Sequence, residues 1–175
     1  MRIKAGFLEG VRCVPTPVHG ARPQPLTISL VVIHCISLPP NAYLNPYVDR
    51  LFTLSLDGNE HPYFKDICKL ELSSHLFINR KGRITQYVSF LDRAYHAGRS
   101  VYNGIPECND YGIGIELEGT VSEPFTEEQY CSLDACLAAI YEAYPATRGH
   151  IAGHSEVAPG RKSDPGPFFD WSRYR

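Results

Sequence analysis

The stretch Ile28-Ser29-Leu30-Val31-Val32-Ile33-His34-Cys35-Ile36 decides the fold class of this chain. It is nearly continuously apolar and rich in β-branched residues, a pattern typical of a strand that is buried on both faces. Pro39 and Pro40 then end the strand. We therefore predict an α/β fold in which residues 28–36 form a central strand.

His34 is unusual because it stands close to the end of this buried run. A buried imidazole needs polar partners, and α/β folds place their sites at the ends of central strands. These two facts make His34 a candidate for chemistry. A core histidine bonded to the backbone is the competing interpretation, and the residues alone leave both open.

Outward from this strand, the chain alternates between strand-like and helical segments. Strands are expected at 74–78, 84–90, 111–117 and 150–154, with a hairpin loop at 79–83, and helices at 46–54 and 124–144. In the longer helix, Thr126 and Gln129 form a capping box and Phe125 can pack on Tyr130. Its apolar stripe makes this helix scaffold rather than a site. The connection at 39–69, interrupted by proline and glycine, is expected to close over the site.

The predicted strand 111–117 places Gly112, Gly114 and Glu116 on one face and isoleucine or leucine on the other. Two glycines beside a carboxylate predict open space above the sheet, where Glu116 can act on a ligand. A surface glutamate on a glycine-rich strand is the alternative interpretation.

A second polar cluster lies near the C-terminus, where His154 precedes Arg161-Lys162-Ser163-Asp164-Pro165-Gly166-Pro167. Two imidazoles and a carboxylate are a normal ligand set for catalytic zinc, which acidifies water and polarises a carbonyl. A separate carboxylate and a cation would then serve as proton acceptor and oxyanion stabiliser. A solvated turn explains the cluster equally well, and spacing alone does not choose among 7 histidines and 19 acidic residues.

Composition limits the classes of function. The chain has 175 residues, 43% apolar and 21% charged, with a net charge of −2, as expected for one globular domain over 1–175 that does not bind nucleic acid. The first ten residues lack the apolar core of a signal peptide, and no apolar run is long enough to cross a membrane. We therefore expect a cytoplasmic protein with no membrane partner. Six cysteines without a C-x-x-C pair do not favour disulfides or a zinc knuckle, and Cys131 and Cys136 are expected in the core.

Ordered motifs along nearly the whole chain resemble those of the AmpD-type 1,6-anhydro-N-acetylmuramyl-L-alanine amidases, a branch of the amidase-2 group that also resembles peptidoglycan recognition proteins. The matching stretches are Val32-Ile33-His34-Cys35-Ile36-Ser37-Leu38-Pro39-Pro40, His61-Pro62-Tyr63-Phe64, Ser73-Ser74-His75, Arg93-Ala94-Tyr95-His96-Ala97-Gly98, Cys108-Asn109-Asp110, Gly114-Ile115-Glu116-Leu117-Glu118-Gly119, Gly153-His154, Arg161-Lys162-Ser163-Asp164-Pro165-Gly166-Pro167 and Phe169-Asp170-Trp171.

The resemblance implies a single α/β domain with a central mixed β-sheet flanked by α-helices. It implies Zn2+ bound by His34, His154 and Asp164, with Glu116 as proton acceptor and Lys162 as transition-state stabiliser. The implied substrate-binding residues are Tyr63, His75, Ala94, His96, Asn109 and Arg161. The implied reaction cleaves the amide between the lactyl group of 1,6-anhydro-N-acetylmuramic acid and L-alanine of a small anhydro-muropeptide, during peptidoglycan recycling in the cytoplasm, and we expect a monomer.

Three residues depart from the family pattern: Cys35, Glu71 and Glu107. They put in doubt how the stem peptide is bound, whereas the implied metal ligands and acid/base pair are unaffected. Two other functions stay open at this point. One is an amidase that acts on murein outside the cytoplasm, and the other is a non-catalytic peptidoglycan-binding module.

Overall fold

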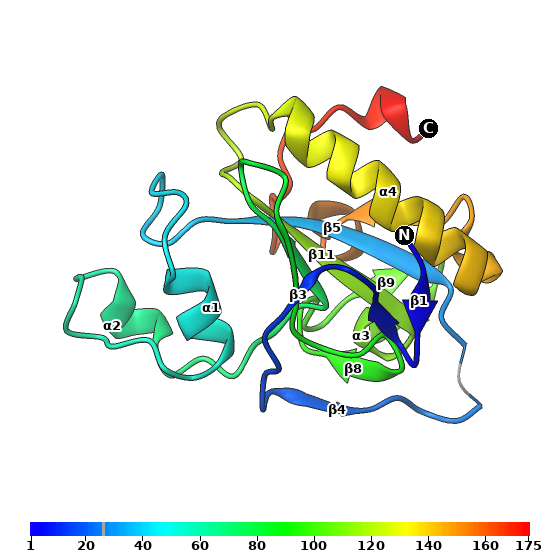
Figure 1. Cartoon of the computed structure of the whole chain (residues 1–175), viewed down its shortest axis with the longest axis horizontal. Helices are drawn as coiled ribbons and strands as arrows, with labels where there is room; N and C mark the ends of the chain where they lie inside the picture. Colours follow the sequence, from blue (N-terminus) through cyan, green and yellow to red (C-terminus); the bar gives the residue numbers. More distant parts are fainter. Residues whose placement is uncertain (26) are drawn as a thin grey trace.

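A six-stranded mixed sheet forms the centre of the protein in the computed structural model, which describes residues 1–25 and 27–175 (Figure 1). Its strands, in spatial order, are β12 (Ile151–Gly153), β5 (Leu30–Ile36), β11 (Gly112–Glu118), β6 (Leu76–Ile78), β7 (Ile84–Gln86) and β3 (Arg12–Cys13). The first four strands run parallel, β7 is antiparallel to β6, and β3 is parallel to β7. The predicted α/β fold with a central mixed sheet is confirmed.

Shorter elements surround this sheet. Two-stranded ladders pair β1 (Ile3–Lys4) with β2 (Phe7–Leu8), β4 (His19–Ala21) with β8 (Asp92–Ala94), and β9 (Val101–Tyr102) with β10 (Ile105–Pro106). The helices are α1 (Tyr47–Phe52), α2 (Phe64–Ile67), α3 (Cys108–Tyr111), α4 (Glu127–Ala143) and α5 (His154–Val157), with 3-10 turns at Pro145–Thr147 and Trp171–Arg173.

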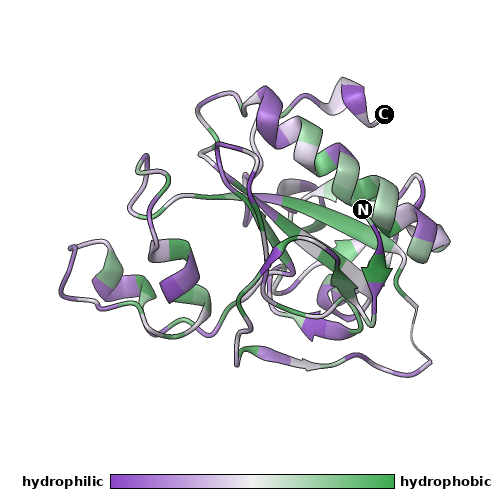
Figure 2. Cartoon of the chain, in the orientation of Figure 1, coloured by the Kyte–Doolittle hydropathy of each residue, from purple (hydrophilic) through white to green (hydrophobic). Residues whose placement is uncertain are grey.

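The side chains of β5 alternate between two cores, one on each face of the sheet. Val31 and Ile33 belong to the larger core, which α4 covers, while Leu30 and Val32 belong to a smaller core on the opposite face (Figures 1 and 2). His34 continues the second set because side chains along a strand alternate. Its imidazole therefore lies on the face away from α4.

Helix α4 is the scaffold that its pattern predicted. Thr126 Oγ1 accepts a hydrogen bond from Gln129 N at 3.2 Å, and Gln129 Oε1 accepts one from Thr126 N at 3.1 Å, so the capping box is confirmed. The predicted apolar stripe also packs on the sheet. Cys136 is buried as expected, but Cys131 is exposed, because it lies on the outer side of the helix. All six cysteines carry free thiols.

Several predicted elements are shorter in the structure. The run 84–90 forms regular strand only as far as Gln86. Tyr87 N still donates a hydrogen bond to His75 O at 3.0 Å, but Tyr87 and Val88 then both pack into one apolar cluster instead of alternating between the two faces. The helix predicted at 46–54 is α1, and Asn45 Oδ1 accepts a hydrogen bond from Tyr47 N at 3.0 Å, as a capping side chain would. The strand predicted at 150–154 ends at Gly153, and His154 already begins α5.

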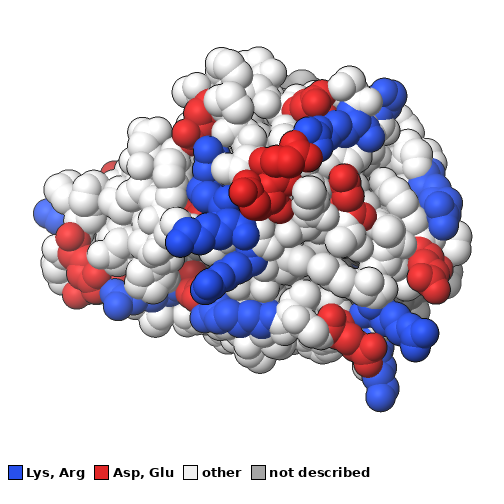
Figure 3. All heavy atoms as spheres, turned by 45° about the horizontal axis from the view of Figure 1, so that its top comes forward, with Lys and Arg blue, Asp and Glu red and all other residues white. Residues whose placement is uncertain are grey.

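Residues 39–69 form a lobe at one side of the sheet, seen on the left of Figure 1. Helices α1 and α2 contribute Val48, Leu51, Phe52 and Phe64 to an apolar cluster that they share with Phe77 of β6 and Tyr87. On the face shown in Figure 3, Lys and Arg side chains lie beside Asp and Glu side chains. In the described part of the chain, no helix combines the length and apolarity needed to cross a membrane.

Candidate metal centre and active site

Three neighbouring strands bring polar side chains to one row at their carboxyl ends. In the parallel register, Glu116 of β11 lies opposite His34 of β5, and Gly153 of β12 lies opposite Ile33. His154 follows Gly153 directly, so it reaches the same level as His34. Parallel pairing therefore assembles residues that are far apart in the sequence.

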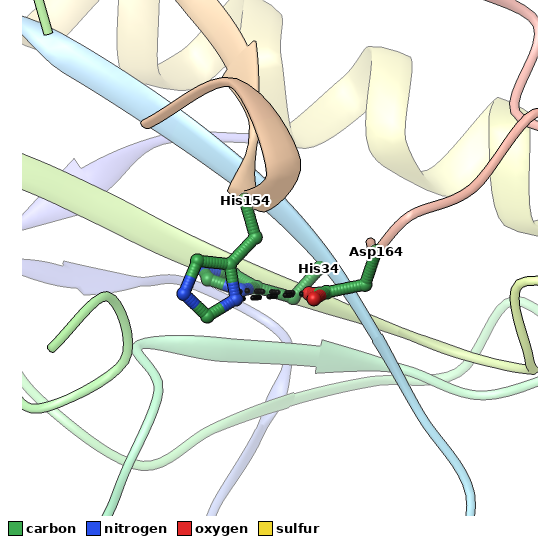
Figure 4. A group of neighbouring side chains, drawn as sticks. All are labelled: His34, His154 and Asp164. Carbon is green, nitrogen blue, oxygen red and sulfur yellow. Dashed lines mark hydrogen bonds and ion pairs between the residues drawn. The ribbon is translucent and has the colours of Figure 1, made fainter. Parts of the chain in front are cut away.

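Side-chain atoms of His34, His154 and Asp164 converge on one point (Figure 4). The Nδ1 atoms of the two histidines are 2.9 Å apart, and Asp164 Oδ2 lies 3.2 Å from His34 Nδ1 and 3.1 Å from His154 Nδ1. Tetrahedral zinc with bonds of about 2.0–2.1 Å separates its ligand atoms by about 3.3 Å. The spacing thus fits three ligands of one small metal ion.

The hydrogen bonds on the far side of the rings support the same conclusion. His154 Nε2 lies 3.2 Å from the carbonyl oxygen of Ala97. A carbonyl only accepts, so Nε2 carries the proton and Nδ1 of neutral His154 presents a lone pair. This lone pair faces the ionised oxygen of Asp164 and the ring nitrogen of His34. Such a group of donors needs a cation, and imidazole with carboxylate suits zinc.

Burial keeps the ring of His34 neutral and available to a metal. Desolvation, opposed by the hydrogen bond with Asp164 and aided by the neighbouring His154, lowers the pKa of His34 to about 4. Burial by itself would raise the pKa of Asp164, but the hydrogen bonds with His154 and His34 outweigh it and hold that pKa well below its usual range. Both groups therefore have the charge state that metal binding requires.

The loop that carries Asp164 is tied back to the start of α5. Ser155 N donates a hydrogen bond to the carbonyl oxygen of Asp164 at 2.9 Å. Glu156 Oε2 in turn accepts one from Gly153 N at 2.6 Å, which fixes the β12–α5 turn. These hydrogen bonds hold His154 and Asp164 close together, although the two residues are ten positions apart in the sequence.

Glu116 is a buried carboxyl with an unsatisfied oxygen. It is 9% exposed, and among the described residues its Oε2 has no hydrogen-bond partner. Burial, followed by the negative charge of Asp164, raises the pKa of Glu116 well above its ordinary value, and the cation of Lys162 opposes this. A buried polar atom without a partner commonly marks a functional group.

These residues open into one hollow of about 530 Å³. Its floor is formed by His34, His154, Asp164 and Glu116. Its rim includes the exposed side chains of Arg161 and Lys162. The 37–40 turn and the α2 lobe supply an apolar wall, with Leu38, Ile67, Leu70 and Leu72. Another hollow, of about 640 Å³ beside β7 and α1, holds none of the predicted site residues.

Comparison with known proteins agrees with this geometry. A family model described as N-acetylmuramoyl-L-alanine amidase matches residues 24–167. The chain belongs to this amidase family. The amidase is 48% identical over 174 residues to the 1,6-anhydro-N-acetylmuramyl-L-alanine amidase AmpD of Enterobacter cloacae, covering 99% of this chain and 93% of that protein. The resemblance predicted from the sequence motifs is confirmed.

Solved structures give the same result. A crystal structure of an AmpD derivative matches the amidase with a TM-score of 0.97 and 48% identity, over 100% of this chain and 98% of that one. The amidase AmiD from Escherichia coli, in complex with anhydro-N-acetylmuramic acid-L-Ala-D-gamma-Glu-L-Lys, matches with a TM-score of 0.62 and 26% identity, over 99% of this chain and 63% of that one.

Of the six residues expected to bind substrate, three line the hollow of the amidase: Tyr63, His96 and Arg161. The structure does not place His75, Ala94 and Asn109 on its wall, because all three are buried behind it and packed among protein groups. His75 Nδ1 accepts a hydrogen bond from Gly114 N at 3.0 Å, so it fastens β11 instead.

The open space expected above Gly112 and Gly114 is filled. A Cβ at Gly114 would lie 2.4 Å from Cγ of His96, and one at Gly112 would lie 2.5 Å from the carbonyl oxygen of Cys108. The glycines therefore admit the ring of His96 and the start of α3 rather than a ligand. Only at Glu116 does this face of β11 meet the hollow.

The three departures from the family pattern have different positions in the amidase. Cys35 lines the hollow, and burial with the nearby carboxylate of Glu116 raises the pKa of its thiol. Glu71 and Glu107 are exposed and do not line the hollow. Cys35 is therefore the one of the three that stands next to the chemistry.

Sequence reasoning missed Arg22, which is 3% exposed and lies behind the site. Its guanidinium donates hydrogen bonds to four carbonyl oxygens, those of Phe90, Asn109, Asp110 and Gly112. Burial lowers its pKa to about 10, so the cation is retained at neutral pH. Its neighbours in sequence, Ala21 and Pro23, carry no signal of this role.

Proposed function

We propose that this amidase hydrolyses, with zinc, the amide between the lactyl group of 1,6-anhydro-N-acetylmuramic acid and L-alanine of a stem peptide. The single observation that carries the proposal is the convergence of His34 Nδ1, His154 Nδ1 and Asp164 Oδ2 within 3.2 Å, beside Glu116, whose Oε2 has no hydrogen-bond partner in the described part of the chain. The named activity of the AmpD relative supports the anhydro sugar as substrate.

The chemistry divides between the metal and the chain. A zinc ion held by the two imidazoles and Asp164 would acidify a water molecule and polarise the scissile carbonyl. Glu116 Oε2 accepts the proton of the attacking water, and the raised pKa of this carboxyl makes it a stronger base. The same oxygen then gives the proton to the departing nitrogen of L-alanine. Lys162 on the rim offers a positive charge to the developing oxyanion.

The hollow suits an amphipathic, anionic ligand. Its wall of leucine and isoleucine side chains matches the methyl groups of the lactyl and alanyl units. Arg161 and Lys162 offer positive charge to the carboxylates of a stem peptide. Tyr63, at 42% exposure, presents its ring on the same rim. Binding by Tyr63, His96 and Arg161 is part of the proposal.

Mass spectrometry of the products tests this function. Purified protein is incubated with an anhydro-muropeptide, then with the same substrate after chelation, and again after zinc is added back. We expect the free peptide and the amino sugar, loss of both with chelator, and recovery with zinc. Turnover that persists in full after verified metal removal would refute zinc dependence.

Polymeric murein serves as the comparison substrate. We expect slow release of peptide from purified sacculi, in keeping with a role in peptidoglycan recycling in the cytoplasm. Faster release from sacculi than from the soluble anhydro-muropeptide would instead favour an amidase acting on the wall itself. Residues 1–175 are proposed to act as one domain and as a monomer, which sedimentation analysis of the purified protein checks.

A further inference from the structure

We propose that His96 and Ala97, two consecutive residues, form a clamp that orients both metal-binding histidines of the amidase. They are positioning residues, since they act through His34 and His154. The inference rests on the proposed metal site, and it assigns to His96 a role beyond a place on the wall of the hollow.

Each residue of the clamp meets one histidine on the side opposite the metal position. His34 Nε2 lies 2.9 Å from His96 Nδ1, and His154 Nε2 lies 3.2 Å from the carbonyl oxygen of Ala97. Histidine ligands generally donate their second ring N–H to an acceptor, which fixes the ring and its tautomer. Here one dipeptide supplies both acceptors, so the two rings are set relative to each other.

The backbone of the clamp is itself held in place from two sides. Asn109 Oδ1 accepts hydrogen bonds from His96 N at 3.1 Å and Ala97 N at 2.8 Å. Arg161 Nη2 donates to the carbonyl oxygens of Ala97 at 2.5 Å and Arg99 at 2.8 Å. The Ala97 carbonyl therefore has a fixed direction before any metal binds.

The ring of His96 is confined as well. It packs over Gly114, where a Cβ would lie 2.4 Å from its Cγ. It meets the ring of His34 edge to face, with centroids 5.0 Å apart and an interplanar angle of 81°, and the ring of His75 with centroids 5.8 Å apart. A ring enclosed in this way presents Nδ1 to His34 in one orientation.

The clamp also defines where the protons are. With Nδ1 of His34 directed at the metal, its Nε2 carries the proton and donates it to Nδ1 of His96. The proton of neutral His96 is then on Nε2, which is buried and has no partner within residues 1–25 and 27–175. A buried N–H without an acceptor is unfavourable. Its presence is consistent with a ring kept in place for the other nitrogen.

Paired substitutions at His96 separate the acceptor from the ring. His96→Phe keeps a ring but removes the acceptor, while His96→Asn places an oxygen at the position of Nδ1. His150→Phe makes the same chemical change at an exposed histidine outside the site. The zinc dissociation constant is measured by competition with a chelating dye, and the absorption spectrum is recorded after Co2+ replaces zinc.

We expect His96→Phe to weaken zinc binding by about 10–100-fold and to change the Co2+ spectrum, while His96→Asn and His150→Phe stay close to the wild type. Unchanged affinity and spectrum in His96→Phe would overturn the clamp. Equal weakening in His96→Phe and His96→Asn would also overturn it, because packing of the ring would then be the cause. A wild-type protein that binds neither ion would instead remove the metal site on which the inference rests.

A measurement on the wild type covers the case in which His96→Phe does not fold. In the zinc-loaded, 15N-labelled protein, the clamp requires a proton on Nε2 of His34 and on Nε2 of His96. Long-range 1H–15N correlation spectra report the tautomer of each ring. A proton on Nδ1 of His96 would reverse the hydrogen bond and refute the proposal.

Discussion

Glu116 and His34 are register partners on the adjacent parallel strands β11 and β5. Their side chains lie on the same face of the sheet, so a carboxyl stands beside the imidazole of the candidate metal site without joining its three converging atoms. The pairing places a carboxyl at a fixed height above the sheet, next to the position that a metal would occupy. Buried strands hold both residues, which is a more rigid support than a loop.

Replacing Glu116 by Gln tests this division of roles. We expect the rate of amide hydrolysis to fall by about 10²–10⁴-fold, as for loss of a general base, while the zinc content stays at the wild-type level. Kinetics on an anhydro-muropeptide, together with metal analysis of the same preparation, check both parts. Loss of zinc along with activity would show that Glu116 is a ligand.

Glu116→Gln should lower activity, but it should raise the stability of the metal-free protein. Because the pKa of Glu116 is raised in the folded protein, the buried charge opposes folding once the pH exceeds the ordinary value of 4.5. Glu116→Gln should therefore stabilise the metal-free protein, and the gain should grow as the pH rises from 4.5 through the raised pKa. Urea unfolding of both proteins at several pH values measures it.

Lys162 is predicted to act on the transition state rather than on substrate binding. Lys162→Met should lower kcat by about 10²–10³-fold, in the range found for loss of an oxyanion donor, with a small change in KM. Lys162→Arg keeps the positive charge and should retain more activity. If Lys162→Met raises KM and leaves kcat unchanged, the cation binds substrate instead.

Acid should destabilise the metal-free protein through its buried histidines. Burial lowers the pKa of His34 to about 4 from 6.5, and it lowers those of His75 and His96 as well. Below pH 6.5 the unfolded chain takes up protons that the folded protein refuses, so stability is lost as the pH falls toward 4. His34 alone accounts for about 3 kcal/mol over that range.

Urea unfolding in the Glu116→Gln background measures this effect without the opposing carboxyl. The free energy of unfolding should fall steadily between pH 6.5 and 4. His19→Asn, which removes an exposed ring, should leave the slope unchanged. A flat profile over this interval would mean that the histidines titrate equally in the folded and unfolded states.

Arg22 should contribute to stability far more than its place in the sequence suggests. Arg22→Met leaves four carbonyl oxygens without their donor and should lower the free energy of unfolding by about 3–5 kcal/mol. Arg83→Met, at an exposed arginine, should change it by less than about 0.5 kcal/mol. Similar midpoints for the two variants in denaturant would contradict this role of Arg22.

The sequence predicted the parts of the fold that depend on local pattern. The apolar run ending near His34 identified the central strand, and the capping box at Thr126 identified the start of α4. The strand predicted at 84–90 was wrong beyond Gln86, because the apolar run continues through Val88 and Phe90 after the side chains stop alternating between the two faces. The prediction that Cys131 is buried was wrong because Cys131 lies off the apolar stripe of Tyr130, Leu133 and Leu137 that packs on the sheet.

At the site, the motif matches identified the candidate residues, and the structure shows how these residues lie relative to one another. His34, His154 and Asp164 come together only through parallel pairing and the turn after β12, which spacing does not encode. His75 and Asn109 were expected to bind substrate because they fall inside stretches that resemble the family's motifs. Their side chains hydrogen-bond to β11 and to the 96–97 backbone, contacts between residues distant in sequence that a local pattern does not predict. Substrate binding by these two residues stays a prediction. Closure of residues 39–69 stays a prediction, which hydrogen exchange with and without product would test.

The missing side chain at Gly114 has a consequence for redesign. Any larger residue there would displace the ring of His96, and that ring touches His34. Positions 96 and 114 are therefore coupled in one direction: a library that enlarges position 114 needs to vary position 96 with it. A larger side chain at position 114 alone would push the ring of His96 away from His34, whereas a smaller side chain at position 96, such as asparagine, meets no clash with Gly114.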